Sequence, residues 1–338
     1  MKSRTILDTR LHPISARQAN CANEPPGYCG RANHLPLAVV IQPAHPRRVR
    51  TPADMAMAAQ LEGAMKIPTI NKQEPLQVEA GVSKLSRVEF ARNPHPALLK
   101  EPRNFWDEIF IANEAYMLDE ITHPRIRSKL AYDAASHRLF LEYVEGRTLN
   151  ELVQAKVTLK EPGRIHKILQ CVAETVADMH AGILCDRPII HNDLKSMNVL
   201  VPLAFPAEGI LIDFSHSYFA GYLPPFIADK KQDPIGTARY MAPEKWDGDY
   251  TNGFKSDVFA FGVMAYYACT GKFPFDGEPA RIEKQIREET PPSPIKSEFK
   301  VLRNTAVVIM SCLEKKPDQR PAMEYVARCY ADTAGLFS

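Results

Sequence analysis

Hydrophobic and polar residues are distributed differently on the two sides of residue 75. Before that point Pro, Asn, Arg and Gln dominate, and no apolar residue recurs with a sustained period. We expect at most one short helix there, over Ala53–Met65. A segment of this kind buries too little apolar surface to offset the entropy that ordering costs. The pattern therefore predicts a basic, Pro-containing and mostly disordered arm over residues 1–75.

Short strand-like segments and one helix follow this arm. Apolar runs bounded by polar turns predict strands over Leu76–Ala80, Arg87–Ala91, Ala97–Lys100, Leu130–Tyr132 and Arg138–Tyr143. Between the third and the fourth of these segments, Phe105–Leu118 has the pattern of a helix. We therefore predict a small, strand-rich lobe over residues 76–143.

After residue 144 the apolar period becomes that of helices. One long helix has an apolar face formed by Ile165, Ile168, Leu169, Val172, Val176 and Met179. Short strands are predicted at Asn198–Val201 and Ile210–Ile212, and helices at Lys255–Thr270, Pro279–Glu288, Phe299–Leu313 and Pro321–Ala331. A strand-rich lobe followed by a larger helical lobe, residues 144–332, is an α+β fold of two lobes.

Composition narrows the classes of function. The 338 residues are 45% hydrophobic, which suffices for a sizeable core, and the net charge of +2 lacks the basic excess of nucleic-acid binders. No apolar run reaches the ~18 residues of a membrane span, and the N-terminus lacks a secretory signal pattern. The seven cysteines form no CxxC pair, which favours a reducing compartment. We expect a cytoplasmic or nuclear protein without nucleic-acid or membrane partners, and we make no prediction of its oligomeric state.

Candidate chemistry lies in the loop after the long helix. Asp193 and Asn198 are five residues apart in this loop, and Asp213 ends the apolar strand that follows. Phosphoryl transfer needs a carboxylate that orients the attacking hydroxyl and accepts its proton, which suits Asp193. It also needs oxygen ligands for Mg²⁺, which suits Asn198 and Asp213. Lys195 could stabilise the developing charge on the transferred group.

Five motifs in this order resemble those of the eukaryotic-type protein kinase family, and the resemblance runs from about Leu76 to Ala331. HNDLKSMN at residues 191–198 resembles HRDLKxxN, and Asp213-Phe214-Ser215 resembles DFG. GTARYMAPE at residues 236–244 resembles the end of the activation segment. The remaining two matches are the helix with Asp257 and Gly262, and Arg320, which stands where the family pairs an arginine with the equivalent of Glu244.

The resemblance also implies a site for ATP in the small lobe. Lys100 stands where the family has its phosphate-binding lysine, and Glu114 stands where the family has the glutamate that fixes this lysine. These two residues join Asp193 and Lys195 as the implied catalytic set. The implied nucleotide-binding residues are Gly81, Ser83, Ser86 and Val88 in the glycine-rich loop, the hinge residues Glu142 and Val144, Leu200 below the adenine, and Lys100 itself.

Several residues depart from the family pattern. Ser83 and Ser86 replace glycines, and Leu98 replaces a small residue above the adenine. Ser215 replaces the glycine of DFG, where we expect a stiffer hinge. Asn192 replaces the arginine that gathers a phosphorylated activation loop, so the loop is of the non-RD type. We therefore expect activity that does not depend on phosphorylation between Ser215 and Ile235, and that survives combined alanine substitution of Ser217, Tyr218 and Tyr222.

The residues leave three hypotheses open. Lys195 and Thr237 are typical of kinases that transfer phosphate from ATP, with Mg²⁺, to serine and threonine of proteins, which is the leading hypothesis. The altered glycine loop, Leu98 and Ser215 favour a pseudokinase that binds partners with little or no catalysis. A small-molecule phosphotransferase would share the HxDxxxxN loop, but its relatives lack the MAPE segment and the arginine that pairs with it. Nucleotide binding, followed by phosphate transfer compared with Asp193→Ala, separates the first two hypotheses.

Overall fold

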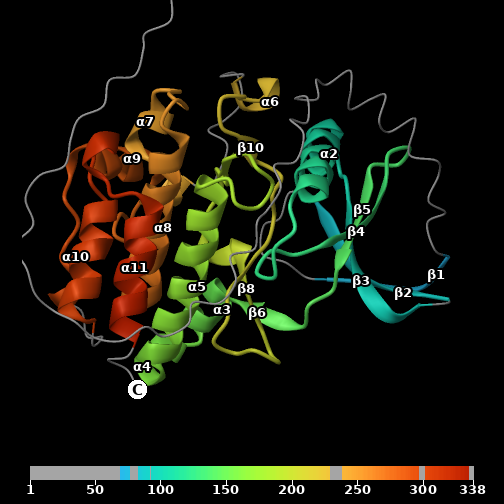
Figure 1. The fold of residues 1–338 in the computed structure, drawn as a ribbon, viewed down its shortest axis with the longest axis horizontal. Coiled ribbons are helices and arrows are strands. Elements are labelled where there is room, and N and C mark those ends of the chain that lie inside the picture. The colour runs from blue at the N-terminus through green and yellow to red at the C-terminus, as the bar shows by residue number, and fades with distance from the viewer. Residues whose placement is uncertain (1–68, 77–82, 92, 229–237, 297–300, 335–338) are drawn as a thin grey trace, which may run out of the picture. The chain divides into compact units, whose positions relative to one another are not determined.

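The computed structural model describes residues 69–76, 83–91, 93–228, 238–296 and 301–334, and all of them belong to one compact unit, residues 55–338. The predicted helix Ala53–Met65 lies outside the described residues, as do Gly81, Thr237 and most of the predicted strand Leu76–Ala80. The described part has a strand-rich lobe followed by a helical lobe (Figure 1), as the sequence predicts.

A five-stranded antiparallel sheet forms the small lobe, with the order β1-β2-β3-β5-β4. Its strands are β1 (Ile70–Pro75), β2 (Lys84–Phe90), β3 (Asn93–Glu101), β4 (Lys129–Asp133) and β5 (Arg138–Glu142). Helix α2 (Phe105–Glu120) contacts β3, β4 and β5 (Figure 1). Asn104 caps this helix, because its side chain accepts a hydrogen bond from the backbone nitrogen of Asp107.

Strand β1 corrects the boundary that we placed at residue 75. Residues 70–75, which we expected to belong to the disordered arm, pair with β2 along their whole length, from Ile70 opposite Phe90 to Pro75 opposite Ser86. Their side chains are exposed or half-buried. Since β1 is an edge strand held by backbone hydrogen bonds rather than by burial, it carries no apolar pattern that sequence analysis could detect.

The large lobe consists of helices α3 to α11, joined by short strands and 3₁₀ turns. The helices are α3 (Leu149–Gln154), α4 (Val157–Lys160), α5 (Pro162–His180), α6 (Pro225–Ala228), α7 (Pro243–Trp246), α8 (Gly253–Thr270), α9 (Pro279–Glu288), α10 (Arg303–Cys312) and α11 (Met323–Ala334). The strands are β6 (Gly146–Thr148), β7 (Ile189–Ile190), β8 (Val199–Pro202), β9 (Ile210–Leu211) and β10 (Tyr218–Phe219). The 3₁₀ turns are Ser196–Asn198, Ala238–Tyr240, Pro294–Lys296 and Pro317–Gln319.

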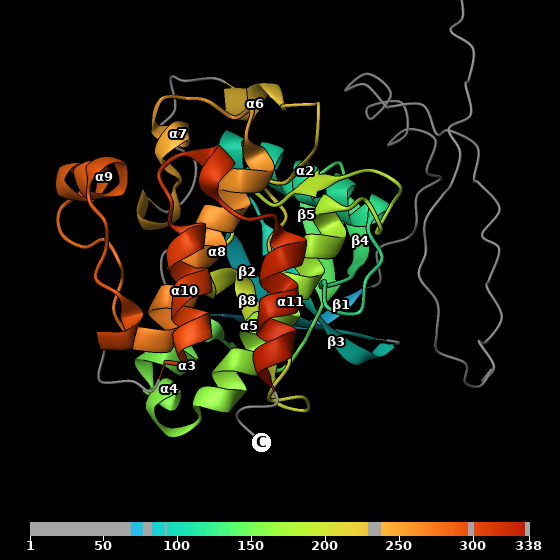
Figure 2. The ribbon, with the colours of Figure 1, turned by 60° about the vertical axis from the view of Figure 1, so that its left-hand side comes forward.

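Helices α5, α8, α10 and α11 pack together as the core of this lobe (Figure 2). The apolar face predicted for α5 is confirmed, because each of its six residues is buried. Helix α8 is buried on nearly all sides. A Cβ atom at Gly262 would lie 2.7 Å from the Cβ of Cys312, so glycine at this position allows α8 to approach α10 closely. No helix in the described ranges is long and apolar enough to cross a membrane.

Candidate active site

The loop over residues 191–198 is held at both ends by backbone contacts. At its start, the backbone nitrogens of His191 and Asn192 donate to the two carboxylate oxygens of Asp257 on α8, at 2.8 and 2.9 Å. At its end, the carbonyl of Asn198 accepts from the nitrogen of Ile212 at 3.0 Å, beside the pairing of β8 with β9. The hairpin therefore brings Asn198 and the residue after Ile212, Asp213, to the same end of two paired strands.

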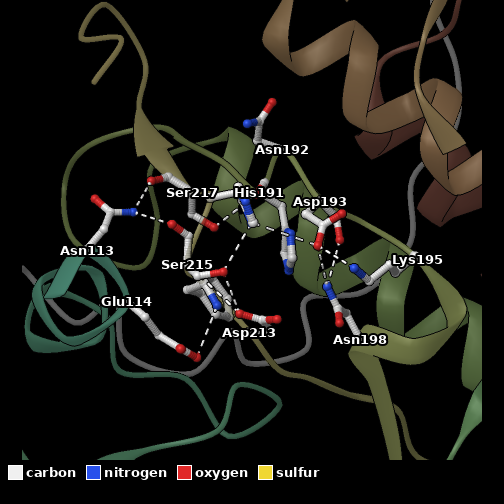
Figure 3. Close-up of polar contacts among 12 residues, drawn as sticks. Asn113, Glu114, His191, Asn192, Asp193, Lys195, Asn198, Asp213, Ser215 and Ser217 are labelled. Carbon is white, nitrogen blue, oxygen red and sulfur yellow. Dashed lines mark hydrogen bonds and ion pairs between the residues drawn. The ribbon is translucent and has the colours of Figure 1, made fainter. Parts of the chain in front are cut away.

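Asp193 lies inside this loop with its carboxylate in contact with two polar side chains. Lys195 donates from Nζ to Oδ2 of Asp193 at 2.7 Å. Asn198 donates from Nδ2 to the Asp193 carbonyl at 2.8 Å and to Oδ2 at 3.1 Å (Figure 3). Among the described residues these contacts end on Oδ2 and on the main chain, so Oδ1 of Asp193 can accept a further hydrogen bond.

Lys100 joins the two lobes through ion pairs. Its Nζ lies 2.6 Å from Glu114 Oε2 on α2 and 3.1 Å from Asp213 Oδ1. Burial alone would lower the pKa of Lys100, but the carboxylates of Asp213 and Glu114 raise it above the ordinary lysine value, so the ammonium group stays charged. The other oxygen of Glu114 accepts from the backbone nitrogen of Phe214 at 3.3 Å, which ties α2 to the DFS segment.

The carboxylate of Asp213 has one occupied and one open oxygen. From the described residues, Lys100 and both the hydroxyl and the backbone nitrogen of Ser215 reach Oδ1, and none of these contacts ends on Oδ2. Burial alone would raise the pKa of Asp213, but Lys100, Lys195 and the Ser215 hydroxyl lower it well below the usual aspartate range. Asp213 is thus ionised, and the contacts described above leave its Oδ2 atom available to a metal ion.

These oxygens fit a magnesium ion. Asn198 uses its amide nitrogen within the loop, which leaves its carbonyl oxygen available, and the pairing of β8 with β9 brings Asn198 and Asp213 to the same end of the two strands. No cluster of three His, Cys, Asp or Glu that could hold a metal occurs among the described residues. A magnesium ion in a nucleotide site needs no such cluster, because it takes one or two protein ligands and completes its shell with water and phosphate.

Strand register corrects part of the predicted glycine loop. Leu98, Lys100 and Leu141 lie on the sheet face that packs toward α2, whereas Leu99 and Phe140 lie in a separate apolar cluster on the other face. Val88 belongs to that second cluster, opposite Ala97, so it lies on the face away from Lys100, a position that does not fit the nucleotide contact that we predicted for it.

Ser86 is displaced for the same reason. It pairs with Leu99, and its hydroxyl accepts from Gln73 on β1 at 3.1 Å, so it lies on the face opposite Lys100 and does not fit a phosphate contact. The residues of β2 that share the face of Lys100 are Leu85 and Arg87, which lie on either side of Ser86 in the sequence. The Arg87 guanidinium lies 5.4 Å from the ring centre of Tyr143 in the hinge. This face of β2 therefore carries the aliphatic Leu85 and the cation of Arg87, and Arg87 is paired with Glu89 at 2.5 Å.

The nucleotide contacts that we predicted for Ser83, Leu200, Glu142 and Val144 stay predictions, and the structure gives the positions of these residues. Ser83 is buried at the bend before β2, and Leu200 is buried on β8, where it pairs with Ile210 and Thr148. Glu142 ends β5 and Val144 follows it in the connection between the lobes. Gly81 lies outside the described residues.

The site also contains residues that the sequence analysis did not single out. Asn113, next to Glu114, donates to the carbonyls of Ser215 and Ser217 at 2.9 and 3.0 Å (Figure 3). His216 lies near Asp193, and Lys245 contacts Asn192. In the sequence, only the position of Asn113 next to Glu114 could have indicated its role, because its hydrogen-bond partners lie more than a hundred residues away.

The activation segment ends in a buried ion pair. Arg320 donates from Nη1 and Nη2 to the two oxygens of Glu244, at 2.7 and 2.8 Å. The pairing of these two residues, which the sequence analysis predicted, is therefore confirmed. Earlier in the segment, Phe214 packs against His191 with ring centres 5.0 Å apart, so Asp213 points toward Lys100 while Phe214 is buried in the core.

Comparison with known proteins agrees with this geometry. The family model described as protein kinase domain matches residues 97–329, more than half of the chain. This chain belongs to the protein kinase family. The two-lobed α+β arrangement described above is the fold of that family.

Three of the curated relatives are serine/threonine-protein kinases of bacteria. The chain is 30% identical over 217 residues to pkn2 of Myxococcus xanthus, covering 62% of this chain and 25% of the relative. It is 28% identical over 271 residues to pkn3 of the same organism, covering 74% and 47%. Serine/threonine-protein kinase A of Synechocystis is 27% identical over 186 residues, covering 54% and 35%. The chain thus spans less than half the length of each of these relatives.

Proposed function

We propose that this protein kinase transfers the γ-phosphoryl group of ATP to serine and threonine hydroxyls of protein substrates. The observation that carries the proposal is the double ion pair of Lys100, with Glu114 at 2.6 Å and with Asp213 at 3.1 Å. It joins the candidate phosphate-binding cation, Lys100, to the candidate metal ligand, Asp213. The base candidate Asp193 forms a separate ion pair with Lys195 at 2.7 Å. The names of the relatives support serine and threonine as acceptors.

Each residue then has a distinct task. Lys100 binds the α- and β-phosphates, and Glu114 holds its ammonium group in place. Asn198 and Asp213 would hold Mg²⁺, which neutralises charge on the phosphate oxygens when it is bound. Asp193 orients the substrate hydroxyl through its available oxygen and takes its proton as the oxygen attacks the γ-phosphorus and the bond to ADP breaks. Lys195 is held by Asp193, close to the place where negative charge spreads over the transferred group.

A direct assay tests this proposal. The full chain is incubated with Mg²⁺, labelled ATP and a peptide library, and the products are analysed for phosphoserine, phosphothreonine and phosphotyrosine. We expect label on serine and threonine, with activity lost in Asp193→Ala and in Asp213→Asn. Label on tyrosine alone, or equal label with wild type and Asp193→Ala, contradicts the proposal.

The roof of the nucleotide site favours one alternative, a pseudokinase that binds nucleotide weakly. Leu98 is buried opposite Leu141, and Arg87 lies on the same face. Leu98 fills space that a small residue leaves open for adenine in the family. Thermal shift with ATP and Mg²⁺ distinguishes the alternatives, because a kinase must be stabilised by the nucleotide whereas a protein with a closed roof is not.

We also propose a reducing compartment, the cytoplasm or the nucleus, as the place of action. The cysteines in the described ranges, Cys171, Cys185, Cys269, Cys312 and Cys329, are all free thiols, which supports this location. The expected partners are ATP and protein substrates that expose serine or threonine.

A further inference from the structure

Ser215 and His216 form a chain of contacts between the two carboxylates of the site. The hydroxyl of Ser215 lies 2.7 Å from Oδ1 of Asp213, and the same oxygen lies 3.1 Å from Nδ1 of His216. Nδ1 of His216 in turn lies 4.0 Å from Oδ2 of Asp193. Figure 3 shows Ser215 and Asp213 side by side, with Asp193 across the loop from them. Hydrogen bonds therefore join Asp213, Ser215 and His216, and the ring of His216 lies next to the base candidate Asp193.

The protons in this chain have one consistent arrangement. An ionised carboxylate only accepts hydrogen bonds, so the single hydroxyl proton of Ser215 goes to Asp213. The Ser215 oxygen must then accept from His216, which places the ring proton on Nδ1. Burial lowers the pKa of His216, and Lys195 and Lys100 lower it further against the opposing carboxylates of Asp193 and Asp213, so the ring is neutral near pH 7. His216 thus donates to Ser215, and Ser215 donates to Asp213, the candidate metal ligand.

Helix α2 holds this pair in place. The ring of His216 packs against Phe110 with centres 4.7 Å apart. Asn113 binds the carbonyls of Ser215 and Ser217 on either side of the histidine. The serine itself causes no backbone strain, because Asp213 is the residue of this segment with a positive φ, 67°, and Ser215 is not among the described residues with positive φ. We expected Ser215 to stiffen the hinge behind Asp213, but in the conformation that the structure adopts the backbone at Ser215 is not strained.

We propose that Ser215 and His216 are positioning residues for phosphotransfer: Ser215 fixes Oδ1 of Asp213 so that Oδ2 points to the metal, and His216 fixes the Ser215 hydroxyl beside Asp193. This inference rests on the proposed function of the same site. It also explains why a serine replaces the expected glycine, since glycine offers no hydroxyl to Asp213.

Hydroxyl removal at residue 215 tests the first half of the proposal. ADP affinity is measured by calorimetry with saturating Mg²⁺ and without Mg²⁺, and kcat and KM for ATP are measured beside it. In Ser215→Ala, and equally in Ser215→Gly, we expect the gain in affinity from Mg²⁺ to fall about tenfold, the effect of one hydrogen bond to a charged group, with metal-free affinity unchanged. Ser215→Thr keeps the hydroxyl and should restore the gain.

Ring replacement tests the second half. His216→Phe keeps the packing against Phe110 but has no donor, so kcat should fall while KM for ATP changes little. His216→Asn places an amide donor near the position of Nδ1 and should recover most of kcat. Ser217→Ala is the matched control, because its hydroxyl binds the carbonyl of His191 at 3.0 Å rather than a carboxylate. It should lower thermal stability and leave the Mg²⁺ dependence as in the wild type.

The outcomes separate this inference from the proposed function. If Ser215→Gly, which restores the family residue, matches or exceeds the wild type in kcat and in Mg²⁺-dependent affinity, the positioning role is rejected even though the protein is a kinase. If the wild type transfers no phosphate but Ser215→Ala still loses Mg²⁺-dependent ADP affinity, the role at Asp213 stands and the proposed function fails. Failure of both Ser215→Thr and His216→Asn to recover activity also rejects the inference.

Discussion

Lys245 donates a 2.6 Å hydrogen bond from Nζ to the side-chain oxygen of Asn192, within a buried site between the activation segment and the catalytic loop. It also reaches the Asn192 carbonyl at 3.3 Å. Burial lowers the pKa of Lys245, although the carboxylates of Asp257, Asp193 and Glu244 oppose this shift. Asn192 has φ of 65°, a conformation that asparagine tolerates better than most residues. The side chain of Lys245 thus fixes the end of the activation segment to the catalytic loop.

Replacing Asn192 with the family arginine should therefore damage this protein. Asn192→Arg brings a second cation against the buried Lys245 and adds strain at a positive φ. We expect a loss of unfolding free energy on the order of 3 kcal/mol, typical of an uncompensated buried charge, measured by urea unfolding. Asn192→Asp is the matched control, because it keeps the local conformation and gives Lys245 an anion, and it should cost far less. A stability of Asn192→Arg equal to that of the wild type would contradict this account.

Activity should not depend on phosphorylation of the activation segment. Between Asp213 and Ile235 the hydroxyl-bearing residues are Ser215, Ser217, Tyr218 and Tyr222, and only Tyr222 is exposed. Phosphatase treatment and Tyr222→Phe should each leave kcat unchanged in the labelled-ATP assay. A drop after either one shows that a phosphate group is needed.

The triple alanine substitution that the sequence suggested is not a clean test of this point. Ser217 binds the carbonyl of His191, and Tyr218 is buried in β10 against Ile190 and Ile227. Their removal would cost packing and a hydrogen bond whatever the role of phosphorylation. Loss of activity in that triple variant would reflect folding, so Tyr222→Phe is the informative change.

The ion pair between Arg320 and Glu244 should contribute strongly to stability. The Arg320 side chain is 0% exposed, and it also donates to the carbonyls of Glu314, Lys315 and Lys255. Arg320→Ala leaves Glu244 buried without its partner, so the free energy of unfolding should fall by about 3–5 kcal/mol in denaturant titration. Arg328, whose side chain is 67% exposed beside Glu324, is the control, and Arg328→Ala should leave the unfolding midpoint unchanged. Equal effects of the two substitutions would rule out this explanation.

Asp257 should make stability depend on acid pH. Burial alone would raise the pKa of Asp257, but the hydrogen bond from His180 and the charges of His180 and Lys245 lower it below the ordinary value of 3.8. A lowered carboxyl pKa adds stability that is fully present above 3.8 and is lost as pH falls through the folded-state value. The difference in unfolding free energy between wild type and Asp257→Asn should therefore shrink on acidification. A difference that stays constant with pH would mean that the charge of Asp257 adds nothing.

Sequence analysis predicted the elements whose stability comes from burial. Helix α9 has the predicted bounds, and the face of α5 is the predicted one, because apolar side chains that must be buried leave a period in the sequence. Strand β1 left no period, because backbone pairing at a sheet edge holds it. In β2 the motif alignment put Val88 and Ser86 in the nucleotide site, whereas the strand register puts both on the face away from Lys100.

The candidate site divides in the same way. Lys100, Glu114, Asp193, Asn198 and Asp213 were all predicted, because motif spacing records them, and the structure brings them together. The contacts that hold them were not predictable. Asn113 meets Ser215 across 102 positions, and Lys245 meets Asn192 across 53, and no local pattern encodes such pairings.

Asn113 also bears on inhibitor selectivity. By holding the carbonyls on both sides of His216, it opposes any movement of the segment that carries Phe214. A compound that needs Phe214 to leave its pocket must break both hydrogen bonds before it can bind, so such compounds should associate slowly and weakly with this kinase. Compounds that accept Phe214 where it lies meet no such barrier, and they can instead gain selectivity from contacts with Leu98.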